Sequence, residues 1–194
     1  MAVKLTLSMT GYYSKNWPKI KILLNDCCVG TAEVCDYSEL DFILDLSNTV
    51  NRLEIHYVDK TEQCTITDSS GNITQDQSVK LQGIRLNDIL LDDWMINKSF
   101  YYPDYTDFPG YLEHVVNPAA EFASHLHWFF PGRFIFAESL PSEDLLWYWY
   151  RDRQRYVYHK KFEGKSGLRE ENYIGSYDPC SDIINEIKEI LDRV

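Results

Sequence analysis

The side chains that could carry chemistry in this chain are aromatic rings and acids, and they do not form a catalytic constellation. The sequence contains no Gly-rich phosphate loop, no nucleophile elbow and no His-Glu-x-x-His pattern. Acids are so numerous that some carboxylates will always be near one another, so their presence does not indicate a glycosidase-like pair. We predict that the protein is not an enzyme and uses no cofactor.

Two groups of residues could bind a metal ion. His125-Leu126-His127, with His114 upstream, offers imidazoles, but residues i and i+2 of a helix point to different faces. Asp92-Asp93, or Asp104 with Asp107, could hold calcium in a sandwich loop, although the spacing is not that of an EF-hand. Acids that simply face water explain the pattern as well, and we predict no metal site.

Aromatic residues make up 14% of the chain and include 14 tyrosines. Rings exposed on a β-sandwich can stack on pyranose rings, and a tyrosine hydroxyl adds a hydrogen-bonding group. Three of the rings lie in a loop closed by Pro18, where they either form a ligand platform or fold back over the core. The candidate glycan-binding residues are Tyr12, Tyr13, Trp17, Tyr101 and Tyr105.

The elements that must position these residues are β-strands. In the stretch Asn51–Leu91, the residues Leu53, Ile55 and Tyr57 alternate with polar residues, which predicts a half-buried strand. The same period of two occurs in Val3–Thr10, Lys19–Leu24 and Leu40–Leu46, and Val79–Leu86 is predicted to be a further strand of this sandwich. With about seven or eight strands before residue 92, the fold class is mainly β, an antiparallel β-sandwich or jelly roll.

The residue pattern of the sequence changes after Leu91. Asp92–Gly110 is aromatic and interrupted by prolines, which predicts an ordered loop draped over a surface. Asn117-Pro118 is predicted to open a short helix that runs through Phe122 and Leu126. We divide the chain into a sandwich core, residues 1–95, and an elaboration, residues 96–194, which packs on the sandwich or on a partner.

Later segments add a strand and two further helices. Arg133–Phe136 is predicted to be a late strand. Ser142 is predicted to cap a helix from Glu143 to about Tyr156, and Asp178-Pro179 or Ser181 to cap a C-terminal helix. The elaboration thus comprises an aromatic loop region, a late strand and two or three helices.

Two features of this C-terminal part could contact a partner. Residues 151–169 hold seven basic and two acidic side chains, which form either a solvated face or a contact with an acidic neighbouring subunit. The terminal helix carries an apolar stripe that packs on its own domain or docks on another chain. The predicted partner-contact residues are Arg151, Arg153, Arg155, Lys160, Lys161, Ile183, Ile184, Ile187, Ile190 and Leu191.

The formal net charge of −11 disfavours binding to nucleic acid or to an anionic membrane. Met1–Lys4 leads directly into the first predicted strand, so we expect no secretory leader, and no apolar run is long enough to span a membrane. The five cysteines are odd in number and match no metal knuckle, as expected for thiols in a reducing cytosol.

The central motifs resemble a known family. The segment His56-Tyr57 through Thr65–Ile73, the acid Asp76, and Val79–Ile89 are similar to small β-sandwich proteins encoded by large contractile-tailed phages, including cyanophage-type myoviruses. Tyr101–Tyr105, Trp128–Phe136 and Pro141–Trp149 are also similar to later segments of those proteins, whereas the N-terminal part and everything after Arg151 differ.

This resemblance covers about half of the chain and its motifs are structural. It implies a virion-associated sandwich similar to carbohydrate-binding modules, made in the host cytoplasm and attached to tail, baseplate or capsid. The expected partners are then other virion proteins in a symmetric assembly. The alternative function is that of a carbohydrate-binding module for a host surface glycan.

Overall fold

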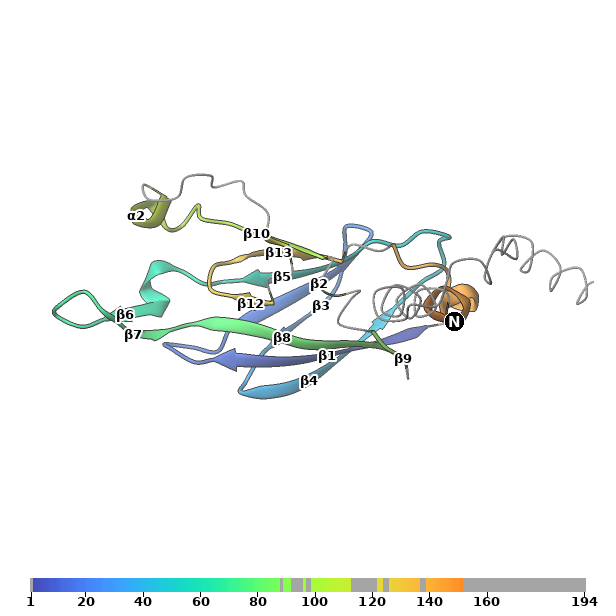
Figure 1. Ribbon diagram of the computed structural model, residues 1–194, viewed down its shortest axis with the longest axis horizontal. Coiled ribbons are helices and arrows are strands. Elements are labelled where there is room, and N and C mark those ends of the chain that lie inside the picture. The colour runs from blue at the N-terminus through green and yellow to red at the C-terminus, as the bar shows by residue number, and fades with distance from the viewer. Residues whose placement is uncertain are drawn as a thin grey trace, which may run out of the picture. The chain divides into compact units, whose positions relative to one another are not determined.

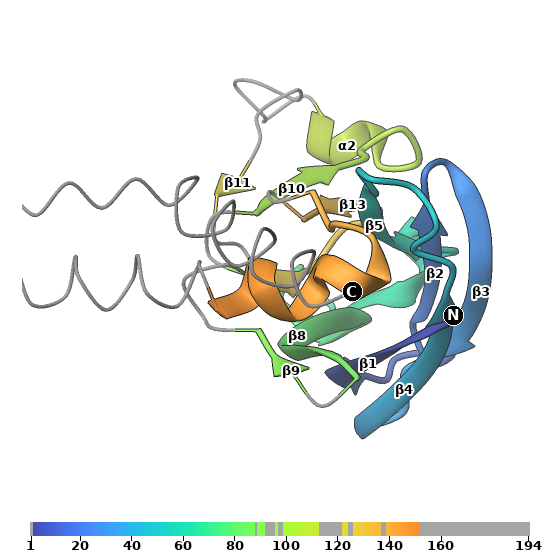
Figure 2. The ribbon, with the colours of Figure 1, turned by 90° about the vertical axis from the view of Figure 1, so that its right-hand side faces the viewer.

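A computed structural model describes residues 2–87, 89–91, 96, 99–112, 122–123, 126–136 and 139–151. All of these residues belong to one unit, Met1–Val157. The described chain is mainly β, and its strands pair in antiparallel fashion, as predicted. Two larger sheets face each other across a hydrophobic core, and Figure 2 shows β10, β13 and β5 on one side and β8 and β1 on the other.

The five-stranded sheet has the order β12-β8-β1-β4, and β9 pairs with the last residues of β8. Its strands are β1 (Val3–Tyr12), β4 (Tyr37–Leu44), β8 (Ser78–Leu86), β9 (Ile89–Leu90) and β12 (His127–Trp128). The six-stranded sheet has the order β11-β10-β13-β5-β2-β3. Its strands are β2 (Lys19–Leu24), β3 (Cys27–Glu33), β5 (Leu53–Val58), β10 (Phe100–Pro103), β11 (Phe122–Ala123) and β13 (Gly132–Ile135).

Short elements connect and extend these sheets (Figure 1). A separate hairpin pairs β6 with β7 and projects from the end of the sandwich where β8 begins. The remaining elements are β6 (Thr65–Thr67), β7 (Ile73–Asp76), the 3₁₀ helices η1 (Glu62–Cys64) and η2 (Glu143–Leu145), and the helix α2 (Pro109–Leu112). No helix among the described residues is long and apolar enough to cross a membrane.

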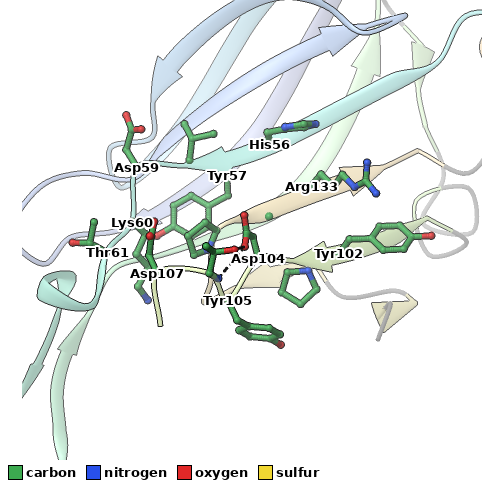
Figure 3. Close-up of a pocket in the computed structure, with 15 residues that line it drawn as sticks. His56, Tyr57, Asp59, Lys60, Thr61, Tyr102, Asp104, Tyr105, Asp107 and Arg133 are labelled. Atoms are coloured by element: carbon green, nitrogen blue, oxygen red, sulfur yellow. Dashed lines mark hydrogen bonds between the residues drawn. The ribbon is translucent and has the colours of Figure 1, made fainter. Parts of the chain in front are cut away.

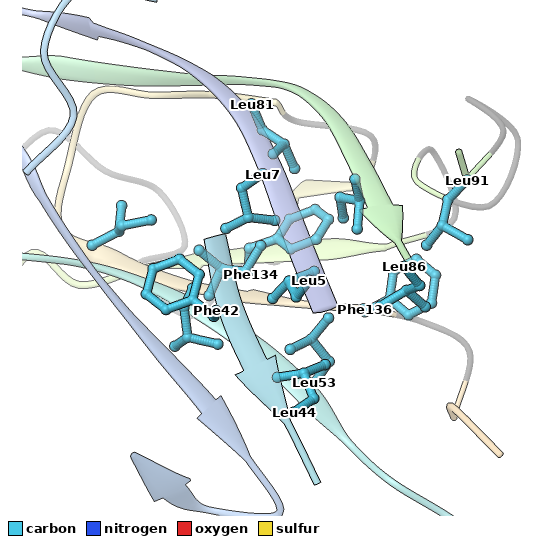
Figure 4. Packing of buried hydrophobic residues seen from close by; sticks show 14 of the residues in the cluster. Leu5, Leu7, Phe42, Leu44, Leu53, Leu81, Leu86, Leu91, Phe134 and Phe136 are labelled. Carbon is cyan, nitrogen blue, oxygen red and sulfur yellow. The ribbon is translucent and has the colours of Figure 1, made fainter. Parts of the chain in front are cut away.

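The core follows from the alternation in the sequence. Side chains at every second position of β1 are buried between the sheets, as are those of β2 and β5. Figure 4 shows Leu5 and Leu7 of β1 packed close to Leu53 of β5 and Phe134 of β13. Burying each of these side chains contributes about 1.5–3 kcal/mol, so this interior supplies most of the driving force for the sandwich.

The Asn25-Asp26 turn joins β2 to β3. Asn25 and Asp26 both have positive φ, 51° and 65°, which is the geometry that joins two strands in a two-residue hairpin. The Asn25 side chain also accepts a 2.8 Å hydrogen bond from the backbone N–H of Arg52 and donates to Asn51. The hairpin between β2 and β3 is therefore tied to the start of β5.

Two predictions for the second half are wrong. Residues 100–103, predicted as loop, form β10, whose register with β13 pairs Tyr101 with Phe134 and Tyr102 with Arg133. Phe122, predicted in a helix, lies in β11 and pairs with Tyr101. In both cases pairing with a neighbouring strand outweighs local preference. The sequence carries no strand signal here, because β11 is too short to show a period and β10 is aromatic on both faces.

The other late elements agree in part with expectation. Arg133–Ile135 lies in a strand, and Ser142 occupies the position before η2 but forms no capping hydrogen bond through its side chain. Residues 146–151 continue as helix. The predicted C-terminal helix and the basic run beyond Arg151 lie outside the described residues.

Gly11 provides a test of the packing between β1 and the chain that follows β3. A Cβ at this position would lie 1.8 Å from the carbonyl oxygen of Val34. Because that atom belongs to the backbone, we expect Gly11→Ala to lower the free energy of unfolding by at least about 2–3 kcal/mol in urea titration. In the matched control Gly83→Ala, the nearest heavy atoms are 3.8 Å away, so a similar loss in this variant would contradict the explanation.

Candidate functional site

The candidate site is an open groove of about 970 Å³ on the six-stranded sheet. It is lined by three segments that are far apart in the sequence: residues 56–61, 102–107 and 131–133. The first segment ends β5, the second ends β10 and continues toward α2, and the third begins β13. Figure 3 shows these segments converging, and we call this site the groove.

The sheet register aligns four side chains on the outer face. Lys21 pairs with His56, His56 with Arg133, and Arg133 with Tyr102, so they form one row across β2, β5, β13 and β10. Figure 3 shows His56, Arg133 and Tyr102 following one another in this order. The Arg133 guanidinium lies over the Tyr102 ring, 5.3 Å from its centroid. We call these four residues the cross-strand row.

A buried carboxylate holds His56 in this row. Glu54 Oε2 lies 2.8 Å from His56 Nε2, and Glu54 Oε1 forms an ion pair with Arg52 Nη2 at 2.7 Å. The Glu54 side chain is almost entirely buried although it points to the outer face. Its charge is therefore balanced within the sheet and adds little negative potential to the groove.

Close packing of strands fixes the middle of the groove. A Cβ on Gly132 would lie 2.4 Å from the carbonyl oxygen of Tyr102 and 2.8 Å from Pro103 Cα. The backbone N–H of Asp104 donates to the carbonyl of Pro131 at 2.6 Å, which continues the contact past the strand ends. Only a residue without a side chain fits at position 132, so β10 and β13 are held close together at this point.

The lining segment 102–107 carries an ionised acid in a local turn. Asp104 Oδ1 accepts hydrogen bonds from the Thr106 backbone N–H at 3.0 Å and from its hydroxyl at 2.6 Å. The hydroxyl bond, followed by the backbone bond, lowers the pKa of Asp104. Asp104 therefore faces solvent as a carboxylate that can accept further hydrogen bonds from a ligand.

An aromatic cluster packs against the lining segment 102–107. The rings of Tyr105, Phe108 and Tyr111 surround Phe130, with centroid separations of 5.0, 5.2 and 4.4 Å. The Tyr101 hydroxyl donates to the Phe130 carbonyl, and its ring stacks on Trp128 at 5.0 Å. The loop from β10 to α2 is thus anchored on the turn between β12 and β13.

Lys60 is buried beneath the same turn, with only 2% of its surface exposed. Its Nζ lies 2.7 Å from Asp76 Oδ1 and donates to the carbonyl of Phe129. The ammonium also lies 5.9 and 5.6 Å from the ring centroids of Phe108 and Phe130. Burial lowers the pKa of Lys60, and the hydrogen bond to Asp76 opposes that shift. Lys60 is a structural bridge beneath the groove.

The structure separates the five predicted glycan-binding residues into two groups. Tyr12 and Tyr13 are 43% and 52% exposed, and Trp17, which packs edge-on against Tyr13, is half-buried. Tyr12 stacks on His127 at 5.1 Å and so lies on the outer face of the five-stranded sheet. Tyr101 and Tyr105 are only 2% and 7% exposed, so neither offers a free ring face for a sugar.

Other predicted ligand residues are only partly covered. His127 Nε2 lies 3.0 Å from the Ser78 hydroxyl, and its ring packs 4.2 Å from that of Phe129, whereas His114 and His125 lie outside the described residues. No group of three His, Cys, Asp or Glu side chains among the described residues could hold a metal ion. Within the described chain, Cys27, Cys28, Cys35 and Cys64 are free thiols.

Among the predicted partner-contact residues, the structure describes only Arg151. Its guanidinium lies 5.2 Å from the ring centroid of Tyr148. The predicted basic and apolar contacts from Arg153 to Leu191 are outside the described residues and stay predictions.

Sequence reasoning missed the groove residues His56, Tyr102 and Arg133. A signal was present, because Glu54 and His56 occupy one face of β5 and Arg52 directly precedes that strand. What the sequence lacked was the register that sets His56 beside Arg133. Chemically, the groove offers hydrogen-bond donors, acceptors and an aromatic ring, which suits reversible binding of a polar ligand.

No family model and no curated protein sequence matches the chain. Two solved structures are similar to it. One is vCBM60 in complex with galactobiose, with a TM-score of 0.46, 10% identity, and coverage of 70% of this chain and 98% of that one. The other is the selenomethionine form of vCBM60, from work on two families of calcium-dependent carbohydrate binding modules. It has a TM-score of 0.46, 11% identity, and coverage of 71% and 91%. At such low identity the likeness concerns the sandwich architecture alone.

Lys60 provides a test of how the groove is supported. We expect Asp76→Asn to lower the free energy of unfolding by about 3 kcal/mol at neutral pH, because a buried ammonium loses its counter-charge. Losing Asp76 lowers the pKa of Lys60 further below its usual 10.5, so the native variant binds fewer protons than the unfolded chain below that pH. Its deficit relative to wild type should therefore shrink as the pH rises toward 10.5, measured by urea unfolding across pH.

The matched control is Asp41→Asn, which breaks an exposed pair between Asp41 and Lys4. Solvent screens that pair, so we expect a much smaller change. Equal losses in the two variants, or a deficit that is independent of pH, would show that Lys60 does not depend on Asp76.

Proposed function

We propose that the protein is a non-catalytic carbohydrate-binding β-sandwich and that the groove is its saccharide site. The observation that carries this proposal is the convergence of ring, donors and acceptors from three segments in one open groove of about 970 Å³. A site of that size accommodates a short oligosaccharide, and a groove that is open to solvent suits a chain that extends beyond it.

The side chains of the groove match the chemistry of a sugar. A pyranose presents apolar C–H faces and a ring of hydroxyls, so it needs an aromatic surface together with paired donors and acceptors. Tyr102 supplies the ring, Arg133 supplies planar donors next to it, and Asp104 supplies an ionised acceptor.

Rigidity also supports the proposal. All three lining segments adjoin paired strands, and segment 102–107 is further held by the aromatic cluster around Phe130 and by the close approach of Gly132 to Tyr102. Side chains held in this way lose little conformational freedom when a ligand binds, which favours recognition without chemical change.

The test is a glycan array followed by titration calorimetry with the best ligand. We expect Tyr102→Ala to weaken binding by about tenfold or more, because truncating a central aromatic contact typically costs over 1 kcal/mol. Tyr37→Ala removes an exposed tyrosine on β4 and is the matched control.

Trp17→Ala examines the aromatic group Tyr12, Tyr13 and Trp17 in the same assay. Loss of binding in Trp17→Ala with no change in Tyr102→Ala would move the saccharide site from the groove to that group. No binding to any glycan by the wild-type protein would refute the proposed function.

We propose, as a second function, a structural role in a phage particle, with the virion as its location. The supporting observation is the exposed apolar group Leu145, Trp147 and Tyr148 on η2 and the helix that follows it. Exposed apolar patches of this kind often mark contacts between proteins. The resemblance of the central motifs to myovirus proteins points in the same direction.

Mass spectrometry of purified particles tests this role directly. We expect the chain in the particle and expect Trp147→Asp to abolish its incorporation without lowering the melting temperature, since Trp147 is exposed. Val50→Asp, at an exposed residue elsewhere, should be incorporated normally. Presence of the chain in the lysate alone, and never in the particle, would exclude the role.

A further inference from the structure

We infer that the groove selects saccharides that carry an anionic group, a carboxylate or a sulfate, and that Lys21, His56 and Arg133 bind that group. This inference rests on the proposed saccharide-binding function. It names the class of sugar that the same site takes.

The geometry of the sheet brings the three side chains together. They follow one another in register on β2, β5 and β13, and neighbouring strands lie about 4.8 Å apart. The backbones of Lys21 and Arg133 are therefore about 10 Å apart, with His56 between them. Two long side chains across that gap can both reach one anion above the imidazole.

The charges of Lys21 and Arg133 are not used elsewhere in the described part of the chain. Each of the other cations of this face has a carboxylate: Lys19 pairs with Asp59 at 3.8 Å and Arg52 with Glu54 at 2.7 Å. Among the ion pairs of the described residues, Lys21 and Arg133 have none, and the Arg133 guanidinium lies over the Tyr102 ring. In a chain of net charge −11, two neighbouring unpaired cations favour an anion locally.

The acids around the groove lie away from this row. Asp59 follows His56 by three residues, just past the end of β5, and Asp104 follows Tyr102 by two, just past the end of β10. Asp107 is exposed in the loop beyond Asp104, and Glu33 lies opposite Lys19 at the sheet edge. Glu54 is ion-paired with Arg52 and hydrogen-bonded to His56.

The groove is therefore asymmetric in charge. Its cationic end is formed by His56 of β5 and Arg133 of β13, with Lys21 of β2 beside His56 in the sheet, and its acidic end lies toward α2. An acidic sugar would place its carboxylate or sulfate at the cationic end, where guanidinium and anion form charge-assisted hydrogen bonds. Its neutral hydroxyls would then face the carboxylates of Asp104 and Asp107, which can only accept hydrogen bonds.

The experiment compares oligosaccharides that differ in charge alone. The probes are a uronic acid oligosaccharide and the same chain after its carboxylates have been reduced to neutral alcohols, titrated at low and high salt. We expect the charged chain to bind about tenfold more tightly at low salt, with the ratio falling as salt screens the row. A sulfated neutral oligosaccharide of equal length shows which anionic group fits better.

Variants assign the preference to the row. Lys21→Gln and Arg133→Gln should each reduce the ratio of affinities several-fold, and the double variant should bring it close to one. Lys80→Gln, at an exposed lysine on the outer face of the other sheet, is the matched control and should leave the ratio unchanged.

Two negative outcomes are distinct. Equal affinity for the charged and reduced chains, or a ratio that Lys21→Gln leaves unchanged, would overturn the anionic preference and leave saccharide binding intact. If the wild-type protein binds none of these chains and no glycan on the array, the proposed function itself fails.

Discussion

The antiparallel register of β5, β13 and β10 is the constraint on which the candidate site depends. It turns Tyr57, Phe134 and Tyr101 into the core and leaves His56, Arg133 and Tyr102 outside, so one pairing scheme fixes both the interior and the groove. A slip of one residue would exchange the two faces and bury the arginine. Gly132 holds this arrangement where the two strands come closest, because any side chain there would meet the backbone of Tyr102. Stability and recognition therefore depend on the same hydrogen-bonded ladder.

The first half of the fold could be predicted from the sequence because its strands are long and alternate cleanly. Val3, Leu5, Leu7 and Met9 are all fully buried, and the Asn25-Asp26 turn has the geometry that its residues favour. Phe100–Pro103 was harder to recognise, because aromatic residues on both faces of a strand hide its period of two. Phe122–Ala123 is a pair of residues whose strand character comes wholly from β10. Local patterns specify an element only where it is long enough to repeat.

The groove was not predictable for a different reason. Its residues come from three segments that lie many positions apart, and none of them carries a motif. The exposed tyrosines of the first loop were predicted as ligand-binding residues because aromatic residues in a loop are a recognisable pattern. His56 and Arg133, in contrast, look like ordinary polar residues of strands. The register that joins them is a property of tertiary pairing. The burial of Tyr101 and Tyr105 shows the converse, since a ring counted as a binding surface in the sequence can instead be part of the frame.

The position of Lys60 has a consequence for chemical labelling. An amine reacts with acylating reagents only when it is neutral and accessible, and this amine is enclosed by Asp76, the Phe129 carbonyl and two phenyl rings. Exposed lysines such as Lys80 will be modified in the folded protein, whereas Lys60 will react only when the turn between β12 and β13 lifts away. The extent of acylation at this single residue therefore measures how often the floor of the groove opens.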